Sequence, residues 1–180
     1  MSAGERIPLA QAKEIAAQCM GDLGPVVKRA LVAGSIRRER EMVGDVEIVA
    51  EPLDVSDLLG NGEPDVESVR RVAHRWGTPV KNGSKFIQVR RPDGVHVDLW
   101  LVTPPAEWWC IVAIRTGPAE LGRHVVTRMQ TRGYKHDGGH VLRAGQRVPV
   151  PDEDAFFSFA GLPCLPPNQR DGDAAMRAVR

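Results

Sequence analysis

The sequence predicts an α/β fold, in which a mixed β-sheet is backed by helices and followed by a smaller C-terminal α/β subdomain. Short apolar or alternating runs, typical of strands, recur through residues 30–102. Segments with apolar side chains at helical spacing lie between and after these runs. Thr103-Pro104-Pro105 then interrupts the pattern, so we expect a boundary near residue 105 that separates residues 1–105 from residues 106–180.

The first unit contains the expected sheet. Residues 8–20 place apolar side chains at helical spacing behind Pro8, so we expect a helix that ends near Gly21. Asn82-Gly83 and Arg91-Pro-Asp-Gly94 have the composition of turns before and after a strand. The strands are expected at residues 30–34, 43–50, 85–90 and 95–102, and a second helix at 65–76.

The second unit is expected to be mostly helical at its start. Two helices, at residues 108–114 and 119–132, are joined at Thr116-Gly-Pro118. Glycine turns and short apolar segments from residue 133 onward predict a small hairpin. A short helix at 153–159 and a proline-rich tail follow.

The overall composition is that of an ordinary globular protein. The chain has 180 residues, 42% of them hydrophobic and 26% charged, with a formal net charge of +1. No apolar run approaches the roughly 20 residues that span a membrane, and the first residues lack the features of a secretory signal, so we expect a cytoplasmic protein. Cys19, Cys110 and Cys164 are widely spaced and odd in number, which predicts reduced and mostly buried thiols.

Positive charge is concentrated in the second unit. Residues 115–147 hold seven Lys and Arg residues against two acidic ones. Such an excess fits a surface that binds a polyanion, and it equally fits a solvated helix face.

Acidic side chains follow two of the expected strands. Asp45 and Glu47 are two residues apart, so both carboxylates project from one face of a strand while Val46 and Ile48 pack on the other. Asp98 likewise points away from the apolar face of its strand. Three carboxylates of this kind suit two Mg²⁺ or Mn²⁺ ions about 3.5–4 Å apart, which is the arrangement of a phosphoryl-transfer site.

Phosphate-binding residues precede these carboxylates. Gly34 and Ser35 end the strand at 30–34, where glycine permits close backbone approach and the Ser hydroxyl can bind a phosphate oxygen. Arg37 and Arg38 supply forked donors that match phosphate geometry and would stabilise negative charge on a leaving pyrophosphate.

At these residues the chain resembles the nucleotidyltransferase superfamily, and within it the family X (polymerase beta-like) DNA polymerases. Gly34-Ser35-x-Arg37-Arg38, six further residues and Asp45-x-Glu47 resemble the phosphate-binding and metal-binding segment of that family. The resemblance covers roughly residues 6–167. It includes Arg6-Ile7-Pro8, Lys85-Phe86, Val97-Asp98-Leu99, Trp108-Trp109-Cys110, Thr116-Gly117, Gly133-Tyr134, Val148-Pro149-Val150 and Leu162-Pro163.

The resemblance implies a nucleotidyltransferase palm over residues 1–105 and a thumb-like, nucleotide-selecting subdomain over residues 106–180. It implies a short form without the lyase and helix-hairpin-helix domains of larger relatives. The implied activity is addition of dNTPs to a primer 3′-hydroxyl of DNA with two Mg²⁺ or Mn²⁺ ions, in gap-filling repair, by a monomer. No membrane partner is expected.

The resemblance also implies roles for individual residues. Asp45 and Glu47 would coordinate both metals, and Asp98 would hold the catalytic one and accept the proton of the primer hydroxyl. The nucleotide would be bound by Arg6, Gly34, Ser35, Arg38, Gly44, Thr116 and Gly117. The DNA would be contacted by Lys85, His96 and Arg123.

Five positions differ from the family pattern. Glu47 stands where polymerases of this family usually have Asp, and Ile114-Arg115 stands where they have an aromatic pair that helps to exclude ribonucleotides. Gly122 and Val126 replace polar residues near the minor groove. Extension of DNA without a template, transfer to a non-DNA acceptor, and a nucleic-acid-binding module that has lost catalysis therefore remain alternatives.

Two further groups have a possible function. His136 and His140 have metal-ligand spacing, but the two glycines between them favour a turn. Trp108 and Trp109 could stack on bases, although core packing of one ring and partial exposure of the other is favoured.

Overall fold

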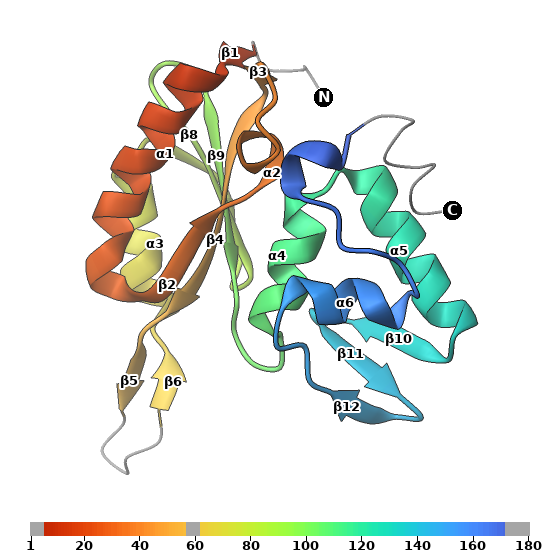
Figure 1. Ribbon diagram of the computed structural model, residues 1–180. Helices are drawn as coiled ribbons and strands as arrows, with labels where there is room; N and C mark the ends of the chain where they lie inside the picture. Colours follow the sequence, from red (N-terminus) through yellow and green to blue (C-terminus); the bar gives the residue numbers. More distant parts are fainter. Residues whose placement is uncertain (1–5, 57–61, 172–180) are drawn as a thin grey trace.

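The computed structural model describes residues 6–56 and 62–171, and its centre is a mixed sheet (Figure 1). Five strands lie in the order β2-β4-β9-β8-β7; β4 and β9 are parallel, and the other neighbours are antiparallel. This confirms the predicted α/β class. The bounds are β2 (Val27–Val32), β4 (Asp45–Pro52), β9 (His96–Leu101), β8 (Phe86–Arg90) and β7 (Thr78–Asn82).

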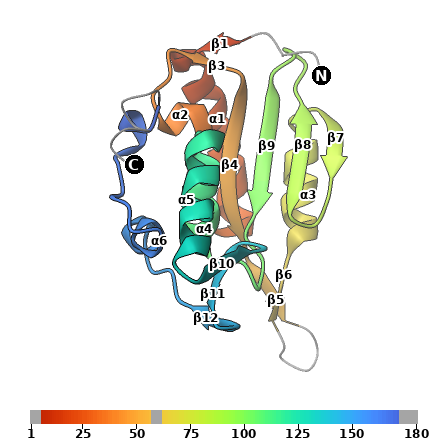
Figure 2. The same ribbon diagram turned by 90° about the vertical axis from the view of Figure 1, so that its right-hand side faces the viewer.

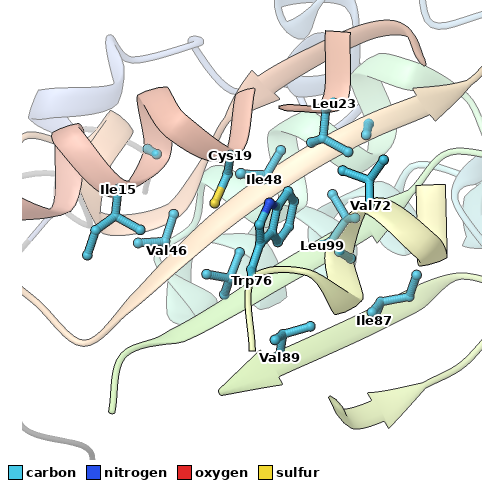
Figure 3. Close-up of a cluster of buried hydrophobic side chains, with 14 of the residues drawn as sticks. Ile15, Cys19, Leu23, Val46, Ile48, Val72, Trp76, Ile87, Val89 and Leu99 are labelled. Carbon is cyan, nitrogen blue, oxygen red and sulfur yellow. The ribbon is translucent and has the colours of Figure 1, made fainter. Parts of the chain in front are cut away.

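Helices α1 (Leu9–Leu23) and α3 (Val66–His74) cover one face of the sheet. The alternation of the strands directs apolar side chains to this face, where they form a hydrophobic core with the two helices (Figure 3). Helix α1 continues past Gly21, where the sequence predicted its end. Because Leu23 is completely buried in this core, its burial outweighs the modest cost of a glycine within a helix.

Several short elements were not predicted. They are β1 (Ile7–Pro8) paired with β3 (Met42–Val43), β5 (Asp54–Ser56) paired with β6 (Gly62–Pro64), the single turn α2 (Gly34–Arg37), and the 3-10 turns η1 (Gly24–Val26) and η2 (Pro167–Gln169). Strand β7 was missed as well. All five of its residues are exposed and it contains Pro79, so it lacks the apolar pattern that identifies a strand.

The C-terminal part packs against the opposite face of the sheet. It comprises α4 (Trp108–Thr116), α5 (Ala119–Thr131), β10 (Tyr134–Asp137), β11 (His140–Arg143), β12 (Gln146–Val148) and α6 (Glu153–Phe159). These elements confirm the predicted helices and hairpin. One hydrophobic cluster lies within this part, and a smaller one joins α4 to the sheet through Val49, Trp108 and Val112. The boundary near residue 105 stays a prediction. The outer ends of the two predicted units, residues 1–5 and 172–180, lie outside the described residues.

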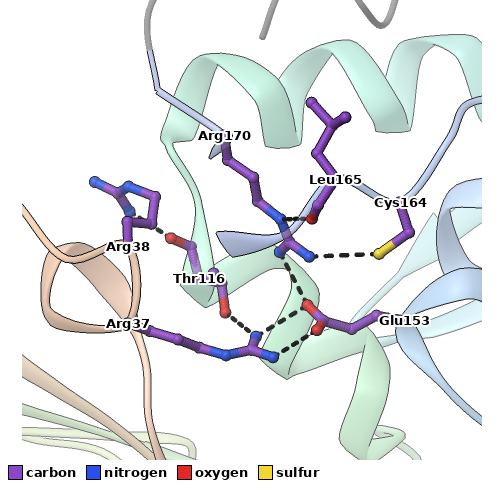
Figure 4. A network of polar contacts seen from close by, with 7 residues as sticks. All are labelled: Arg37, Arg38, Thr116, Glu153, Cys164, Leu165 and Arg170. Carbon is purple, nitrogen blue, oxygen red and sulfur yellow. Dashed lines mark hydrogen bonds and ion pairs between the residues drawn. The ribbon is translucent and has the colours of Figure 1, made fainter. Parts of the chain in front are cut away.

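A buried ionic network ties the C-terminal part to the first unit (Figure 4). The Glu153 carboxylate on α6 accepts hydrogen bonds from Arg37 of α2 (2.6 and 3.0 Å) and from Arg170 (2.9 Å). Arg170 is only 1% exposed, and it also donates to the carbonyl of Leu165. Burial would raise the pKa of Glu153, but the hydrogen bonds from Arg37 and Arg170 lower it below its ordinary value. Glu153 is therefore held as a carboxylate between two guanidinium groups.

The predictions for the cysteines and the paired tryptophans are confirmed. Cys19, Cys110 and Cys164 are free thiols, the first two buried and the third half-buried. Trp108 is buried and Trp109 is partly exposed. Of the helices in residues 6–56 and 62–171, none has the length and apolar character needed to cross a membrane.

Candidate active site

The parallel pairing of β4 and β9 brings the three predicted carboxylates together. Glu47 lies opposite Asp98 in the register, and Asp45 lies opposite His96. Their neighbours Val46 and Ile48 point to the other side, into the core with α1 and α3. Because strand residues alternate between faces, all three acids project from the face opposite that core, as the sequence predicted.

The three carboxylates lack sufficient compensating positive charge. Burial, together with repulsion from Asp45 and Asp98, raises the pKa of Glu47 to about 7. Burial also raises the pKa of Asp45, against the opposing charges of His96, Arg38 and Arg6. The pKa of Asp98 is raised by burial, although a hydrogen bond from Gln88 opposes this. Burial and mutual repulsion thus create a demand for cations at this face.

The donor set and its position are suited to a hard divalent ion, but the side chains do not form a preassembled cluster. Among residues 6–56 and 62–171, no group of three or more His, Cys, Asp or Glu side chains is arranged so that it could hold a metal ion. Asp98 is engaged elsewhere, because its Oδ1 accepts a hydrogen bond of 2.8 Å from Gln88 Nε2. Carboxylate oxygens are the ligands that Mg²⁺ prefers, so the residues fit the ion chemically.

Gly34 is required by the position of Glu47. A Cβ atom at residue 34 would lie 1.8 Å from Glu47 Oε2, and the φ angle of Gly34 is +58°. Glycine adopts this left-handed conformation without steric cost, and its missing side chain leaves the space that the carboxylate occupies. Gly34 therefore places the Glu47 carboxylate at the start of α2.

We expect Gly34→Ala to abolish most activity while lowering stability only modestly. The backbone conformation costs about 1 kcal/mol for alanine, and the new methyl group displaces the Glu47 carboxylate, which reduces turnover at least about tenfold. Gly94→Ala is the matched control, because Gly94 also has a positive φ (+84°) but has no atom near the added Cβ. Equal loss of activity in both variants, measured at equal folded fraction, would refute this role of Gly34.

We expect Glu47→Gln to stabilise the metal-free protein at alkaline pH. The Glu47 carboxyl titrates near pH 7 when folded and near 4.5 in its ordinary state, so the folded state binds the proton more tightly. Stability therefore falls as pH rises from 4.5 to 7, and glutamine removes this loss. In EDTA at pH 8 the free energy of unfolding of the variant should be about 1–3 kcal/mol higher than that of the wild type. At pH 4 the two free energies of unfolding should be equal. Urea unfolding measures this, with the exposed Glu14→Gln on α1 as control.

Two of the predicted nucleotide-binding arginines line one hollow, and their charges act on Asp45. A cavity of about 380 Å³ is lined by Arg6, Arg38, Glu39, Arg40, Glu41, Met42, Asn168 and Asp171. The charges of Arg6 and Arg38 both act on Asp45. Arg38 also donates to Asp171 (3.0 and 3.1 Å) and to the backbone carbonyl of Thr116. The three arginines of the lining are matched in number by Glu39, Glu41 and Asp171, so the hollow carries charges of both signs, with Asp171 as a carboxylate on Arg38.

The other predicted nucleotide-binding residues lie in different surroundings. Ser35 Oγ is buried, and within the described part of the chain it has no hydrogen-bond partner. Gly44 is exposed directly before Asp45. Thr116 is fully buried with its hydroxyl engaged by Arg37, and Gly117 lies against the Arg38 guanidinium. The Ser35 hydroxyl is thus buried without a partner among the described residues, whereas the Thr116 hydroxyl is already used.

The predicted DNA-binding residues are not all brought together. His96 is beside Asp45 on the carboxylate face. Lys85 is exposed immediately before β8, and Arg123 is exposed on α5. Figure 2 shows α4 and α5 on the β4 side of the sheet and no described helix in front of β8 and β7. The Arg115 side chain of α4 covers Trp100 of β9 and Asp98 is only 8% exposed, so the uncovered part of this face lies over β8 and β7.

The sequence placed Trp100 on the face of Asp98, but it gave no role there to Lys81, Gln88 or Arg115, which lie on or above the same face. Gln88 and Lys81 lie on the neighbouring strands; Gln88 bonds to Asp98, and the charge of Lys81 acts on Asp98. Trp100 on β9 stacks on Phe86, and the Arg115 guanidinium of α4 lies over the Trp100 ring. The alternation of side chains along β9 and β8 predicts the face on which Trp100 and Gln88 lie. It does not predict which residues their side chains contact.

The two histidines of the second unit lie at a hairpin, as predicted. His136 and His140 are on β10 and β11, which are joined through Gly138 and Gly139. Burial lowers the pKa of His136, which favours its neutral form. The predicted turn is confirmed, because the two histidines lie on the strands of a hairpin and not on a helix.

The chain has a distant similarity to one curated DNA polymerase. No family model matches it. It is 27% identical over 163 residues to DNA polymerase lambda of Rattus norvegicus, which covers 78% of this chain and 28% of that protein. The chain therefore spans less than a third of that relative. This similarity supports the family X resemblance at most, and it suggests DNA nucleotidyltransferase activity.

Proposed function

We propose that this protein is a metal-dependent DNA nucleotidyltransferase, which adds dNTPs to a primer 3′-hydroxyl, releases pyrophosphate and fills short gaps during repair. The observation that carries the proposal is the position of the three acids. Asp45, Glu47 and Asp98 share one sheet face, and the charges of Arg6 and Arg38, which line a hollow, act on Asp45. The similarity to DNA polymerase lambda supports the same reaction class.

In the proposed site, Asp45, Glu47 and Asp98 would hold Mg²⁺ or Mn²⁺, which when bound lowers the pKa of a 3′-hydroxyl and stabilises charge on the phosphates. Asp98 would accept the hydroxyl proton. Gln88 orients Asp98 through its 2.8 Å hydrogen bond, so one oxygen is fixed and the other remains for the reacting group. Glu47 is held against Gly34 on the other side.

The triphosphate is proposed to bind in the hollow that contains Arg6 and Arg38. Both guanidinium groups act on Asp45 electrostatically, and a guanidinium offers forked donors that match the oxygens of a phosphate. Ser35 supplies a buried hydroxyl that lacks a partner among the described residues. Asp171 would have to leave Arg38 or share it, because a triphosphate and a carboxylate compete for the same donors.

The DNA is proposed to lie across the same sheet face of β9, β8 and β7. His96, Lys81 and Arg90 lie on these strands, and Lys85 precedes β8. Contacts of this kind to phosphates would make binding depend on salt and not on sequence.

Extension without a template is the second candidate. Gly122 on α5 presents no side chain, and a Cβ there would meet only Ile114 at 3.7 Å. A helix that offers no polar group at this position provides little to check a base pair.

Incorporation of each dNTP and rNTP opposite each of the four template bases separates the candidates. The proposal expects addition of the complementary dNTP to a primer in a one-nucleotide gap. Addition that ignores the template base would favour the second candidate. Metal and nucleotide binding without any addition would indicate a binding module, and it would overturn the proposed function.

A further inference from the structure

Arg38 is held by two acceptors that both belong to the C-terminal part. Its Nε atom donates to the two carboxylate oxygens of Asp171 at 3.0 and 3.1 Å, and its guanidinium also donates to the backbone carbonyl of Thr116. The side chains of Arg38 and Asp171 are only 13% and 20% exposed, so water screens this ion pair less than it screens an exposed one. A carboxylate of the chain itself therefore occupies an arginine that was predicted to bind phosphate.

The segment that carries Asp171 is anchored at two points. The preceding residue, Arg170, is buried and donates to Glu153 of α6 at 2.9 Å. Asn168 donates to Glu39, which follows α2, at 3.3 Å. Because these contacts hold the Asp171 carboxylate near its arginine, it acts at a high effective concentration.

Asp171 lines the same hollow as Arg6, Arg38 and Arg40. Its Oδ2 atom also lies 3.8 Å from Arg40 Nε. Phosphate oxygens accept hydrogen bonds from the same guanidinium donors as a carboxylate, so an anion that bonds to Arg38 Nε displaces Asp171. With Asp171 present, the arginines of the lining are matched in number by carboxylates; without its charge, the lining has an excess of one positive charge.

We propose that Asp171 is an internal competitor of the nucleotide, whose carboxylate occupies Arg38 until a chain of phosphates displaces it. The inference rests on the proposed function, because it takes Arg38 as a phosphate ligand. Asp171 acts through Arg38, so it is a positioning residue that sets the affinity for the triphosphate. The apparent affinity for a ligand is reduced by the fraction of molecules in which its site is free, and Asp171 lowers that fraction.

Asp171→Asn keeps the shape of the side chain and removes its charge, so it should bind inorganic tripolyphosphate about three- to tenfold more tightly than the wild type. Asp171→Glu keeps the competing charge, and its affinity should stay near that of the wild type. Arg38→Gln removes the donor and should lose most of the binding. In primer extension, Asp171→Asn should lower the KM for dNTP by a similar factor and leave kcat unchanged, because the competition affects binding alone.

Calorimetric titration of each folded protein with tripolyphosphate, in EDTA and without DNA, tests the inference. Asp93→Asn is the matched control, because Asp93 also accepts a hydrogen bond from an arginine Nε atom (Arg91, 3.2 Å) but does not line the hollow. Its affinity should equal that of the wild type. Equal or weaker binding by Asp171→Asn, as expected if Asp171 only stabilises the C-terminal segment, overturns the inference.

A second measurement needs no variant at Asp171. The Nε–H signal of Arg38 in a proton–nitrogen NMR spectrum of the wild type, assigned by its loss in Arg38→Gln, should shift when tripolyphosphate replaces the carboxylate. If Asp171→Asn does not fold, this signal decides, and an unchanged signal at saturating tripolyphosphate overturns the inference.

The titration separates this inference from the proposed function, since it contains neither metal nor primer. Tighter binding by Asp171→Asn supports the role of Asp171 even if no primer is extended, a result that removes only the proposed function. Primer extension by the wild type, with equal tripolyphosphate affinities in both proteins, removes only the role of Asp171. No binding of tripolyphosphate by either folded protein overturns the inference as well.

Discussion

Asp98→Ala is expected to eliminate nucleotide addition while leaving the fold intact. Asp98 lies opposite Glu47 on the neighbouring parallel strand, and it is the acid that we propose accepts the primer proton. Its removal takes away both a proposed metal ligand and a proton acceptor, so we expect turnover to fall by at least about a thousandfold. Single-turnover extension of a labelled primer at saturating dNTP measures the loss.

The control for this variant is its own stability. Burial disfavours the Asp98 carboxylate more than Gln88, His96 and Lys81 favour it, so alanine removes an unfavourable charge and should leave the unfolding temperature unchanged or higher. Asp98→Asn should likewise be folded and inactive. Substantial activity in either folded variant would show that the reaction does not depend on this carboxylate.

Glu153→Ala is expected to have the largest effect on stability. Glu153 is the common acceptor for Arg37 and Arg170, and the Arg170 side chain is 1% exposed. Alanine leaves a buried guanidinium without its carboxylate, which costs about 3–5 kcal/mol when one partner of a buried pair is removed. Urea unfolding at neutral pH measures the change.

An exposed ion pair provides the comparison for Glu153→Ala. Lys135 pairs with Asp137 at 2.7 Å, but the lysine side chain is 66% exposed. Removal of such a pair has little effect because water already screens it, so Lys135→Ala should unfold like the wild type. A loss in Glu153→Ala no larger than in Lys135→Ala would contradict the structural role of the network.

The part of the site that follows from local periodicity could be predicted from the sequence. The faces of Asp45, Glu47 and Asp98 depend only on strand alternation, which the apolar pattern of β4 and β9 makes visible. The proximity of these strands came from the family resemblance, and the structure then gave the register that pairs Glu47 with Asp98. The hairpin of β10 and β11 was predictable for a similar reason, because its glycines mark the turn.

The parts that depend on tertiary contacts could not be predicted. Asp171 meets Arg38 across 133 residues, and no local pattern connects them. The contact of Arg115 with Trp100 depends on where α4 packs on the sheet, and the bond from Gln88 to Asp98 depends on the pairing of β8 with β9. The sequence placed Arg115 in a basic region, which gave its charge but not its partner.

The central claim is that this face transfers a nucleotide to DNA, and one measurement tests it most directly. A labelled primer on a one-nucleotide-gapped duplex is incubated with the wild-type protein and all four dNTPs, with Mg²⁺, with Mn²⁺, or with EDTA. The account predicts a primer one nucleotide longer with either ion and an unchanged primer in EDTA. An unchanged primer under all three conditions, from a protein shown to be folded, would contradict it.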